Sequence, residues 1–297
     1  MSTGKSPFRR DKRFDMSEVP SDTEILTVPF GFHLDDLTSL TRFRELCSLD
    51  LRGQRALTDL EPLRALTQID HLNLRECGGV TDLSPLRALK RLQSLDVSYT
   101  SVADLAPLET CTELQSFEAC DCGGIRAVEP LRGLTQLESL NLVATRGVAD
   151  YSCLASLTNL TSLDLGHNTM RDVGIVAAMP HLTNLELGGS DVEDLSGVRG
   201  HPSLEVLCLD RCSQLNDLGA LRDLPRLRIL SLDGCCQLTD LAPVATLDSL
   251  EVLNIRNCTG LSDLGALVHL PELSAVFAQG CVFDVSRSKL ETVTYLT

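Results

Sequence analysis

The chain has no tryptophan, and aromatic residues make up only 4% of its 297 positions. Its hydrophobic content of 43% is therefore almost entirely aliphatic, which predicts a core packed by leucine and valine rather than by aromatic rings. No stretch of about 20 consecutive apolar residues occurs, so the sequence contains no candidate transmembrane helix. We expect no membrane insertion.

Signatures of catalysis are also missing. No G-x-S-x-G or H-E-x-x-H motif is present, and Gly4-Lys5-Ser6 lacks the preceding glycine and strand of a phosphate-binding loop. The six histidines are scattered, and no motif places one of them beside a nucleophile. The cysteines form no C-x₂-C pair of the kind that binds zinc. We expect no catalytic residue, no cofactor and no metal ion.

What the sequence does contain is a repeat of 22 or 23 residues. The pattern L-x-x-L-x-L recurs, followed in many repeats by Asn, Cys or Thr and then by D-L-x-P-L. The repeats start at Leu46, Ile69, Leu92, Leu114, Leu137, Leu160, Leu182, Leu204, Leu227, Leu250 and Leu273. A fixed period of this length is typical of a leucine-rich repeat solenoid. The spacing predicts about eleven full repeats, and a degenerate copy at residues 23–45 is expected to cap them.

Each repeat is expected to contribute one short strand. In Ser48–Arg52, Leu49 and Leu51 point inward and the other residues point outward, because strand side chains alternate between faces. The predicted fold is an α/β leucine-rich repeat solenoid, with a curved parallel sheet of twelve strands on its concave face and short helices or 3-10 turns on its convex face. We divide the chain into a basic N-terminal arm (1–22), the repeat domain (23–285) and a C-terminal tail or cap (286–297).

The repeats resemble those of two leucine-rich repeat classes. Segments Thr58–Leu63, Thr81–Leu86 and Thr239–Val244 read T-D-L-x-P-(L/V), which is similar to the 22-residue class of the bacterial internalins and the eukaryotic phosphatase-1 regulatory subunit. The cysteines that replace asparagine are similar to those of the cysteine-containing class. The resemblance implies the solenoid fold, and its phosphatase-1 branch implies a regulatory subunit that cups a globular enzyme.

Two columns of residues are explained by architecture. Eight positions after the repeat start, six of eleven residues are cysteines, which we expect to hydrogen-bond the backbone of the turn leaving the strand. Another column holds an aspartate before each L-x-P-L turn, with Ala127 as the one break, and these carboxylates are expected to cap the short helices. Stacked repeats produce rows rather than clusters of ligands, which disfavours zinc and calcium.

The cysteines also bear on the compartment. Disulfides between stacked neighbours such as Cys212 and Cys235 are geometrically possible. The start Met1-Ser2-Thr3-Gly4-Lys5 shows no apolar signal segment, however, so reduced thiols in a reducing compartment are expected. We expect the cytoplasm or cytoskeleton rather than secretion or the mitochondrion.

The outward-pointing strand residues form the concave face, which changes character near residue 200. The candidate partner-binding residues of its acidic part, including one strand-exit aromatic, are Asp50, Asp96, Tyr99, Glu118, Asp164 and Glu186. Those of its apolar part are Val206, Cys208, Ile229, Val252 and Phe277. The acidic line is either a solvated face or a steering surface for a basic partner. The apolar patch is either an interface or a surface covered by the C-terminal residues.

A third candidate surface is the N-terminal arm, in a chain whose formal net charge is −15. Its candidate residues are Lys5, Phe8, Arg9, Arg10, Lys12, Arg13 and Phe14. The arm either binds a partner or lies on the acidic face of its own solenoid. A mitochondrial presequence is disfavoured by its acidic residues Asp11, Asp15 and Glu18.

These observations predict a non-enzymatic protein-binding scaffold. We expect a stoichiometric structural subunit of a larger intracellular assembly, cytoskeletal or organellar, with one or more proteins as partners. The alternative is a regulatory subunit that binds a globular enzyme, such as a Ser/Thr protein phosphatase, on the concave face. An acidic solenoid repels phosphates, so nucleic acid is not expected as a partner. Neither role requires a homo-oligomer.

Overall fold

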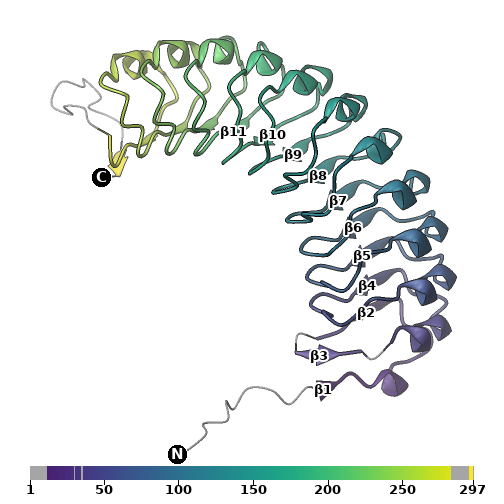
Figure 1. The fold of residues 1–297 in the computed structure, drawn as a ribbon. Helices are drawn as coiled ribbons and strands as arrows, with labels where there is room; N and C mark the ends of the chain where they lie inside the picture. The colour runs from purple at the N-terminus through teal and green to yellow at the C-terminus, as the bar shows by residue number, and fades with distance from the viewer. Residues whose placement is uncertain (1–11, 30, 35, 282–293, 297) are drawn as a thin grey trace, which may run out of the picture.

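The computed structural model describes residues 12–29, 31–34, 36–281 and 294–296. The chain coils into an open arc, with one parallel sheet along the inner, concave side and short helices along the outer, convex side (Figure 1). Strands that follow one another in sequence are neighbours in this 13-stranded sheet, which runs from β15 to β2. This arrangement confirms the predicted leucine-rich repeat solenoid.

Each strand of this 13-stranded sheet is only three residues long. The strands of the main sheet are β2 (Ile25–Thr27), β4 (Ser48–Asp50), β5 (His71–Asn73), β6 (Ser94–Asp96), β7 (Ser116–Glu118), β8 (Ser139–Asn141), β9 (Ser162–Asp164), β10 (Asn184–Glu186), β11 (Val206–Cys208), β12 (Ile229–Ser231), β13 (Val252–Asn254), β14 (Ala275–Phe277) and β15 (Thr294–Leu296). The central residue from β4 to β14 is buried and its two neighbours are exposed or half-buried, as at Leu49 in β4. The sheet therefore has one core face and one open face.

The convex side is built from 3-10 helices, and the described residues contain no α-helix. They are η2 (Thr38–Arg42), η3 (Glu61–Ala65), η4 (Ser84–Ala88), η5 (Ala106–Thr110), η6 (Glu129–Leu131), η7 (Ser152–Ser156), η8 (Gly174–Ala178), η9 (Ser196–Val198), η10 (Gly219–Leu221), η11 (Ala242–Thr246) and η12 (Gly265–His269). A repeat of this length leaves room for about one helical turn, and the tighter 3-10 form is the usual choice for such short pieces.

The aspartate column binds the start of the short helices, but from the position before the predicted one, since the N-cap residue is the next one, such as Leu60, and makes no side-chain cap bond. In ten repeats the carboxylate accepts the backbone N–H of the residue two positions later, as Asp59 does from Glu61 at 2.8 Å. The ten residues are Asp36, Asp59, Asp82, Asp104, Asp150, Asp172, Asp194, Asp217, Asp240 and Asp263. Asp284 lies outside the described residues.

The cysteine column likewise bonds the backbone. The thiol of Cys235 donates to the carbonyl oxygen of Leu209 at 3.0 Å, and that of Cys258 donates to Leu232 at 3.0 Å. At the same position of another repeat, the Asn168 amide donates two bonds, to Leu142 at 2.9 Å and to Leu165 at 3.1 Å. Cysteine thus makes a weaker form of the same hydrogen bond to the backbone. All twelve cysteines are free thiols.

The N-terminal cap includes residues from the segment predicted as an arm. Strand β1 (Lys12–Arg13) pairs with β3 (Phe32–His33) in a separate two-stranded sheet, and η1 (Met16–Glu18) follows it. The buried amide of Gln54 accepts from the Leu34 N–H at 2.9 Å and donates to the Phe32 carbonyl at 3.0 Å. One side chain therefore links the cap to the first full repeat.

Candidate protein-binding surface on the concave face

The open face of the sheet presents two rows of side chains, because every strand pairs in register with the next. One row runs from Ser48 through Ser162 to Val206 and Ala275, and the other from Asp50 through Asp164 to Cys208 and Phe277. The structure thus brings the sequence-predicted acidic residues into one line and the predicted apolar residues into its continuation.

Three of the five predicted carboxylates also have a structural role. Asp50, Asp96 and Asp164 each accept the backbone N–H two residues later, at 3.0, 2.8 and 2.9 Å. Asparagines at the same position, such as Asn73 and Asn141, make the same bond. This bond therefore forms with Asp or Asn alike and does not depend on a negative charge, and other repeats have Glu, Cys, Ser or Phe at the same position.

In the middle of this row, burial opposes the negative charge of two carboxylates, Glu118 and Asp164. Burial, with the negative charge of Asp96 added, raises the pKa of the Glu118 carboxyl. Burial also raises the pKa of Asp164, and the nearby Glu186 adds to the shift. The N-terminal end of the row is different, since Arg52 forms an ion pair with Asp50 at 2.8 Å. Among the described residues, no ion pair within 4.0 Å involves Glu118, Asp164 or Glu186.

The strand exits form the rim of this face. At the seventh position after each repeat start the backbone has a positive φ, which glycine adopts freely and other residues adopt at a cost of about 1–2 kcal/mol. Glycine occupies this position in four repeats, and the other seven residues are Glu76, Tyr99, Asp121, Ala144, His167, Arg211 and Asn257. The ring of Tyr99 is 42% exposed there, with the Arg75 guanidinium 4.7 Å from its centroid.

The apolar part of the face is a row on adjacent strands. Val206, Ile229 and Val252 pair directly across β11, β12 and β13, and Ile229 is 39% exposed. Cys208 is half-buried in the neighbouring row, and burial raises the pKa of its thiol. The ring of Phe277 lies under the Arg256 guanidinium, 4.7 Å from its carbon. Val206, Ile229 and Val252 thus form a continuous apolar row, whereas Ser231 and Asn254 lie between Cys208 and Phe277 in the neighbouring row.

An ion-pair clasp that sequence reasoning missed borders this patch. Arg228, at the strand-entry side of Ile229, contacts Glu251 at 2.8 Å and Glu205 at 3.9 Å. The three residues occupy the same position in consecutive repeats, so the alternating charges along that column were the available signal. One guanidinium thus faces two carboxylates, so the group keeps a net negative charge beside the patch.

The described part of the C-terminal segment does not lie over the apolar patch. Strand β15 pairs with β14, so that Ala275 is opposite Thr294 and Phe277 is opposite Leu296. It extends the sheet at its edge instead of crossing the concave face (Figure 1). Residues 282–293 lie outside the described part of the chain.

The structure describes only the last residues of the predicted N-terminal arm. Lys5, Phe8, Arg9 and Arg10 lie outside the described residues. Lys12 and Arg13 form β1, and Phe14 packs edge-on against Phe32 with 6.3 Å between the ring centroids. The last residues of the predicted arm are therefore part of the cap.

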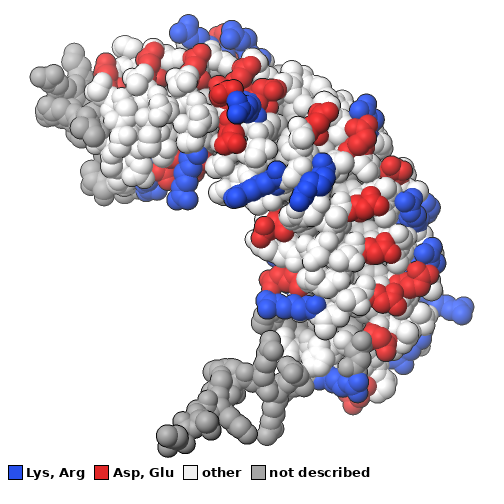
Figure 2. Space-filling view, viewed as in Figure 1, with Lys and Arg blue, Asp and Glu red and all other residues white. Residues whose placement is uncertain are grey.

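Charged side chains also lie outside the concave face. Figure 2 shows acidic residues spaced along the flank near the convex side. Within the described ranges, no three His, Cys, Asp or Glu side chains come close enough to hold a metal ion. None of the described helices has the length and apolarity to cross a bilayer.

Comparison with known proteins places the fold. No family model matches the sequence, and no curated protein does. An internalin (InlF) from Listeria monocytogenes is 21% identical, with a TM-score of 0.71 over 93% of this chain and 86% of that chain. The functional domain of InlJ from the same organism, which includes a cysteine ladder, is 17% identical with a TM-score of 0.69 over 92% and 61%.

A third similar structure spans both chains almost completely. The leucine-rich repeat protein LIC12759 of Leptospira interrogans is 15% identical, with a TM-score of 0.55 over 97% of this chain and 100% of that chain. These likenesses, together with the eleven registered repeats, identify a leucine-rich repeat protein with internalin-like repeats. At these identities the likeness concerns the fold.

Proposed function

We propose that this leucine-rich repeat protein is a non-enzymatic protein-binding scaffold, and that it is a stoichiometric structural subunit of a larger assembly. The observation that carries the proposal is the apolar row of Val206, Ile229 and Val252 on the concave face, in which Ile229 is exposed and the two valines are half-buried within the described part of the chain. Burying such a row against a partner contributes about 25 cal/mol for each Å² of apolar surface removed from water. Exposed contiguous apolar patches usually mark interfaces of this kind.

The proposal includes a reducing, intracellular setting. It is supported by the twelve free thiols, six of which lie in one stacked column. Stacked free thiols in neighbouring repeats are better suited to a compartment that keeps them reduced. The open, curved face is supporting evidence for a binding role, since it lacks the enclosed site in which catalysis usually occurs.

A second candidate function is a regulatory subunit that binds a basic surface of a globular enzyme. It is favoured by Glu118 and Asp164, two carboxylates of the concave row whose negative charge is opposed by burial. Asparagine at position 164 would preserve the turn at a lower electrostatic cost, as Asn141 does in the adjacent strand. A basic partner would recover that cost by pairing with the carboxylates.

One experiment separates the two functions. The tagged protein is purified from its native source at low salt and at about 0.5 M salt, which shortens the Debye length to a few ångströms, and co-eluting proteins are identified by mass spectrometry. Ile229→Asp is compared with Val268→Asp, a control on the convex helix η12 whose side chain is equally exposed, at 38% against 39%. A structural subunit keeps its partner at high salt and loses it in Ile229→Asp only.

The regulatory function predicts the opposite pattern. The partner would be lost at high salt and in the triple variant Asp96→Asn, Glu118→Gln, Asp164→Asn, whose two asparagines preserve the turns. It would be retained in Ile229→Asp. A partner that is unaffected by either set of variants would rule out the concave face for both functions.

A further inference from the structure

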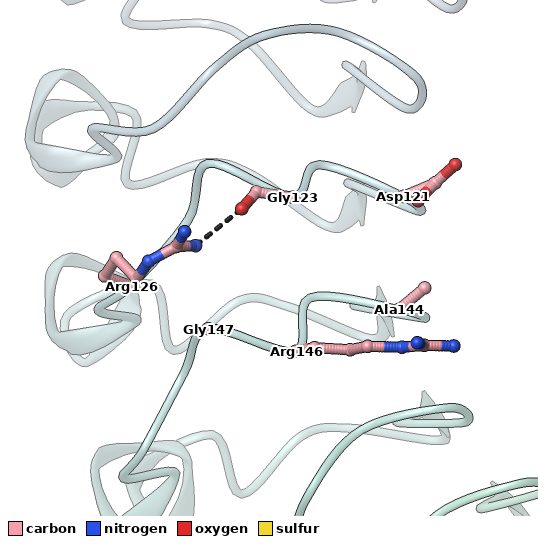
Figure 3. A pocket seen from close by; sticks show the side chains of 6 residues that line it. All are labelled: Asp121, Gly123, Arg126, Ala144, Arg146 and Gly147. Carbon is pink, nitrogen blue, oxygen red and sulfur yellow. Dashed lines mark hydrogen bonds between the residues drawn. The ribbon is translucent and has the colours of Figure 1, made fainter.

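Two arginines from successive repeats border one hollow on the flank of the solenoid, beside the strand-exit rim of the concave face. The hollow has a volume of about 520 Å³. It is lined by Asp121, Gly123, Arg126, Ala144, Arg146 and Gly147 (Figure 3).

Both arginines are held by backbone carbonyls rather than by carboxylates. Arg126 Nη1 donates to Gly123 O at 2.5 Å and to Ile125 O at 3.1 Å, and Arg146 Nε donates to His167 O at 3.2 Å. A guanidinium has five N–H donors, so several donors of each remain unused by these bonds. No ion pair of Arg126 or Arg146 occurs within the described part of the chain. Two ordered positive charges thus stay un-neutralised in a strongly acidic protein.

The position of Arg126 depends on Gly147. A Cβ atom at residue 147 would lie 2.1 Å from Arg126 Nη1 and 2.6 Å from its Cδ. Only glycine therefore lets the Arg126 side chain lie across the next repeat, where it borders the hollow. At Gly123 a Cβ would meet nothing within 4 Å, so the opposite side of the hollow is open. Gly147 thus leaves room for the Arg126 side chain, and the two arginines place positive charge at the hollow.

We propose that this hollow binds a carboxylate-bearing segment of a protein partner, independently of the concave face. Guanidinium groups match carboxylates in shape and form paired, charge-assisted hydrogen bonds with them. A short acidic segment fits two arginines that are one repeat apart. A nucleic acid fits less well, because its phosphates would continue beyond the two arginines along a protein whose net charge is −15.

The test is direct binding of fluorescein-labelled hexaglutamate, followed by fluorescence anisotropy at low salt with hexaglutamine as the uncharged probe. Arg126→Gln/Arg146→Gln is compared with Arg199→Gln/Arg222→Gln, which removes the same charge from exposed residues at the ends of η9 and η10. We expect hexaglutamate to bind, and the affinity to fall at least about tenfold in the first variant only. Equal losses of affinity in both variants would show that hexaglutamate binding depends only on net charge, and would overturn the proposal.

Gly147→Ala tests the shape of the hollow without removing a charge. The added methyl group displaces Arg126, so binding should weaken although both arginines remain. Wild-type affinity in Gly147→Ala, or no binding of hexaglutamate to the wild type, contradicts the proposed site. Tighter binding of a single-stranded RNA hexamer than of hexaglutamate, through the same two arginines, would replace the peptide partner with a nucleic acid.

Discussion

Asp164 and Asn141 are paired in register on adjacent strands, and each accepts the backbone N–H two residues later, at 2.9 Å from Gly166 and 3.0 Å from Val143. The same local structure is thus built once with a charged side chain and once with a neutral one. The pair shows that this turn is stabilised by the side-chain hydrogen bond, whether or not the side chain is charged. Asp164→Asn should therefore preserve the fold and change only the charge.

We predict that Asp164→Asn raises the free energy of unfolding at neutral pH, by about 0.5 kcal/mol, the usual limit for an exposed or half-exposed position. Burial raises the folded-state pKa of Asp164 above 3.8, so its ionisation destabilises the folded protein. The gain should be present at neutral pH and disappear as the pH falls below 3.8, where the carboxyl is protonated in both states. Urea unfolding at several pH values measures it. A marked loss of stability at neutral pH would show that the charge itself supports the fold.

The cysteines should react according to burial. Burial raises the pKa of Cys258 to about 12 and that of Cys77 to about 11, while Cys236 is exposed. The thiolate is the reactive form, so at about pH 8 a disulfide reagent such as DTNB should modify Cys236 quickly and the buried column only on unfolding. Cys236→Ser should remove the fast phase, and Cys258→Ser should leave it unchanged. Rapid modification of Cys258 in the folded protein would contradict the packing described here.

The sequence predicted those parts of the fold that share the repeat period. Leu49 and Leu51 are buried as the alternating pattern requires, and the aspartates hydrogen-bond the start of the helices, although from one position before the N-cap residue. Strand β15 was missed because Thr294 pairs with Ala275, 19 positions earlier, which is out of phase with the period of 22 or 23. A periodic pattern cannot predict a partner that lies outside its frame.

The same limit applies to the candidate surface. The rows of the concave face follow from strand alternation, so the sequence predicted their members. The contact between Arg75 and Tyr99 depends instead on how long side chains from neighbouring repeats bend toward each other at the strand exit. The hollow at Arg126 depends on a glycine one repeat away. Such contacts between columns are set by side-chain conformation, which spacing alone does not determine.

The N-terminal cap gives a prediction about truncation. Met16 is buried, and the Arg42 guanidinium donates to the carbonyl oxygens of Met16 and Val19. Removing residues 1–19 should lower the free energy of unfolding by about 2 kcal/mol or more, the value of one buried large side chain. Removing residues 1–11 should leave it unchanged, and thermal unfolding by circular dichroism compares the two. Equal stability of both truncated proteins would mean that β1 and η1 add nothing to the cap.

This distinction matters for binding experiments on the basic arm. Loss of a partner after removal of residues 1–19 would combine damage to the cap with loss of the positive charges. Removal of residues 1–11 deletes Lys5, Arg9 and Arg10 and keeps β1 intact. Only the shorter truncation tests the predicted arm as a binding element.

His201 makes the middle of the solenoid sensitive to pH. It is buried after η9, where the neighbouring repeats have Met179 and Leu224, and both of its ring nitrogens are used. Nε2 lies 2.9 Å from the Met179 carbonyl oxygen and must donate to it, while Nδ1 accepts the Ser203 N–H at 3.3 Å. Protonation would place a second donor against that N–H, so the folded state requires the neutral ring. Burial accordingly lowers the pKa of His201.

A lowered folded-state pKa means that the unfolded chain binds the extra proton first. The contribution of His201 is therefore complete above the ordinary value of 6.5 and is lost as the pH falls below it, with a slope of at most about 1.4 kcal/mol for each pH unit. In His201→Leu this loss should disappear, and chemical unfolding between about pH 5 and 7.5 compares the two proteins. His181→Leu, at an exposed position in the preceding repeat, is the control and should keep the wild-type slope. If His201→Leu retained the same slope, the pH sensitivity would have to originate in other groups, because a leucine cannot bind the proton.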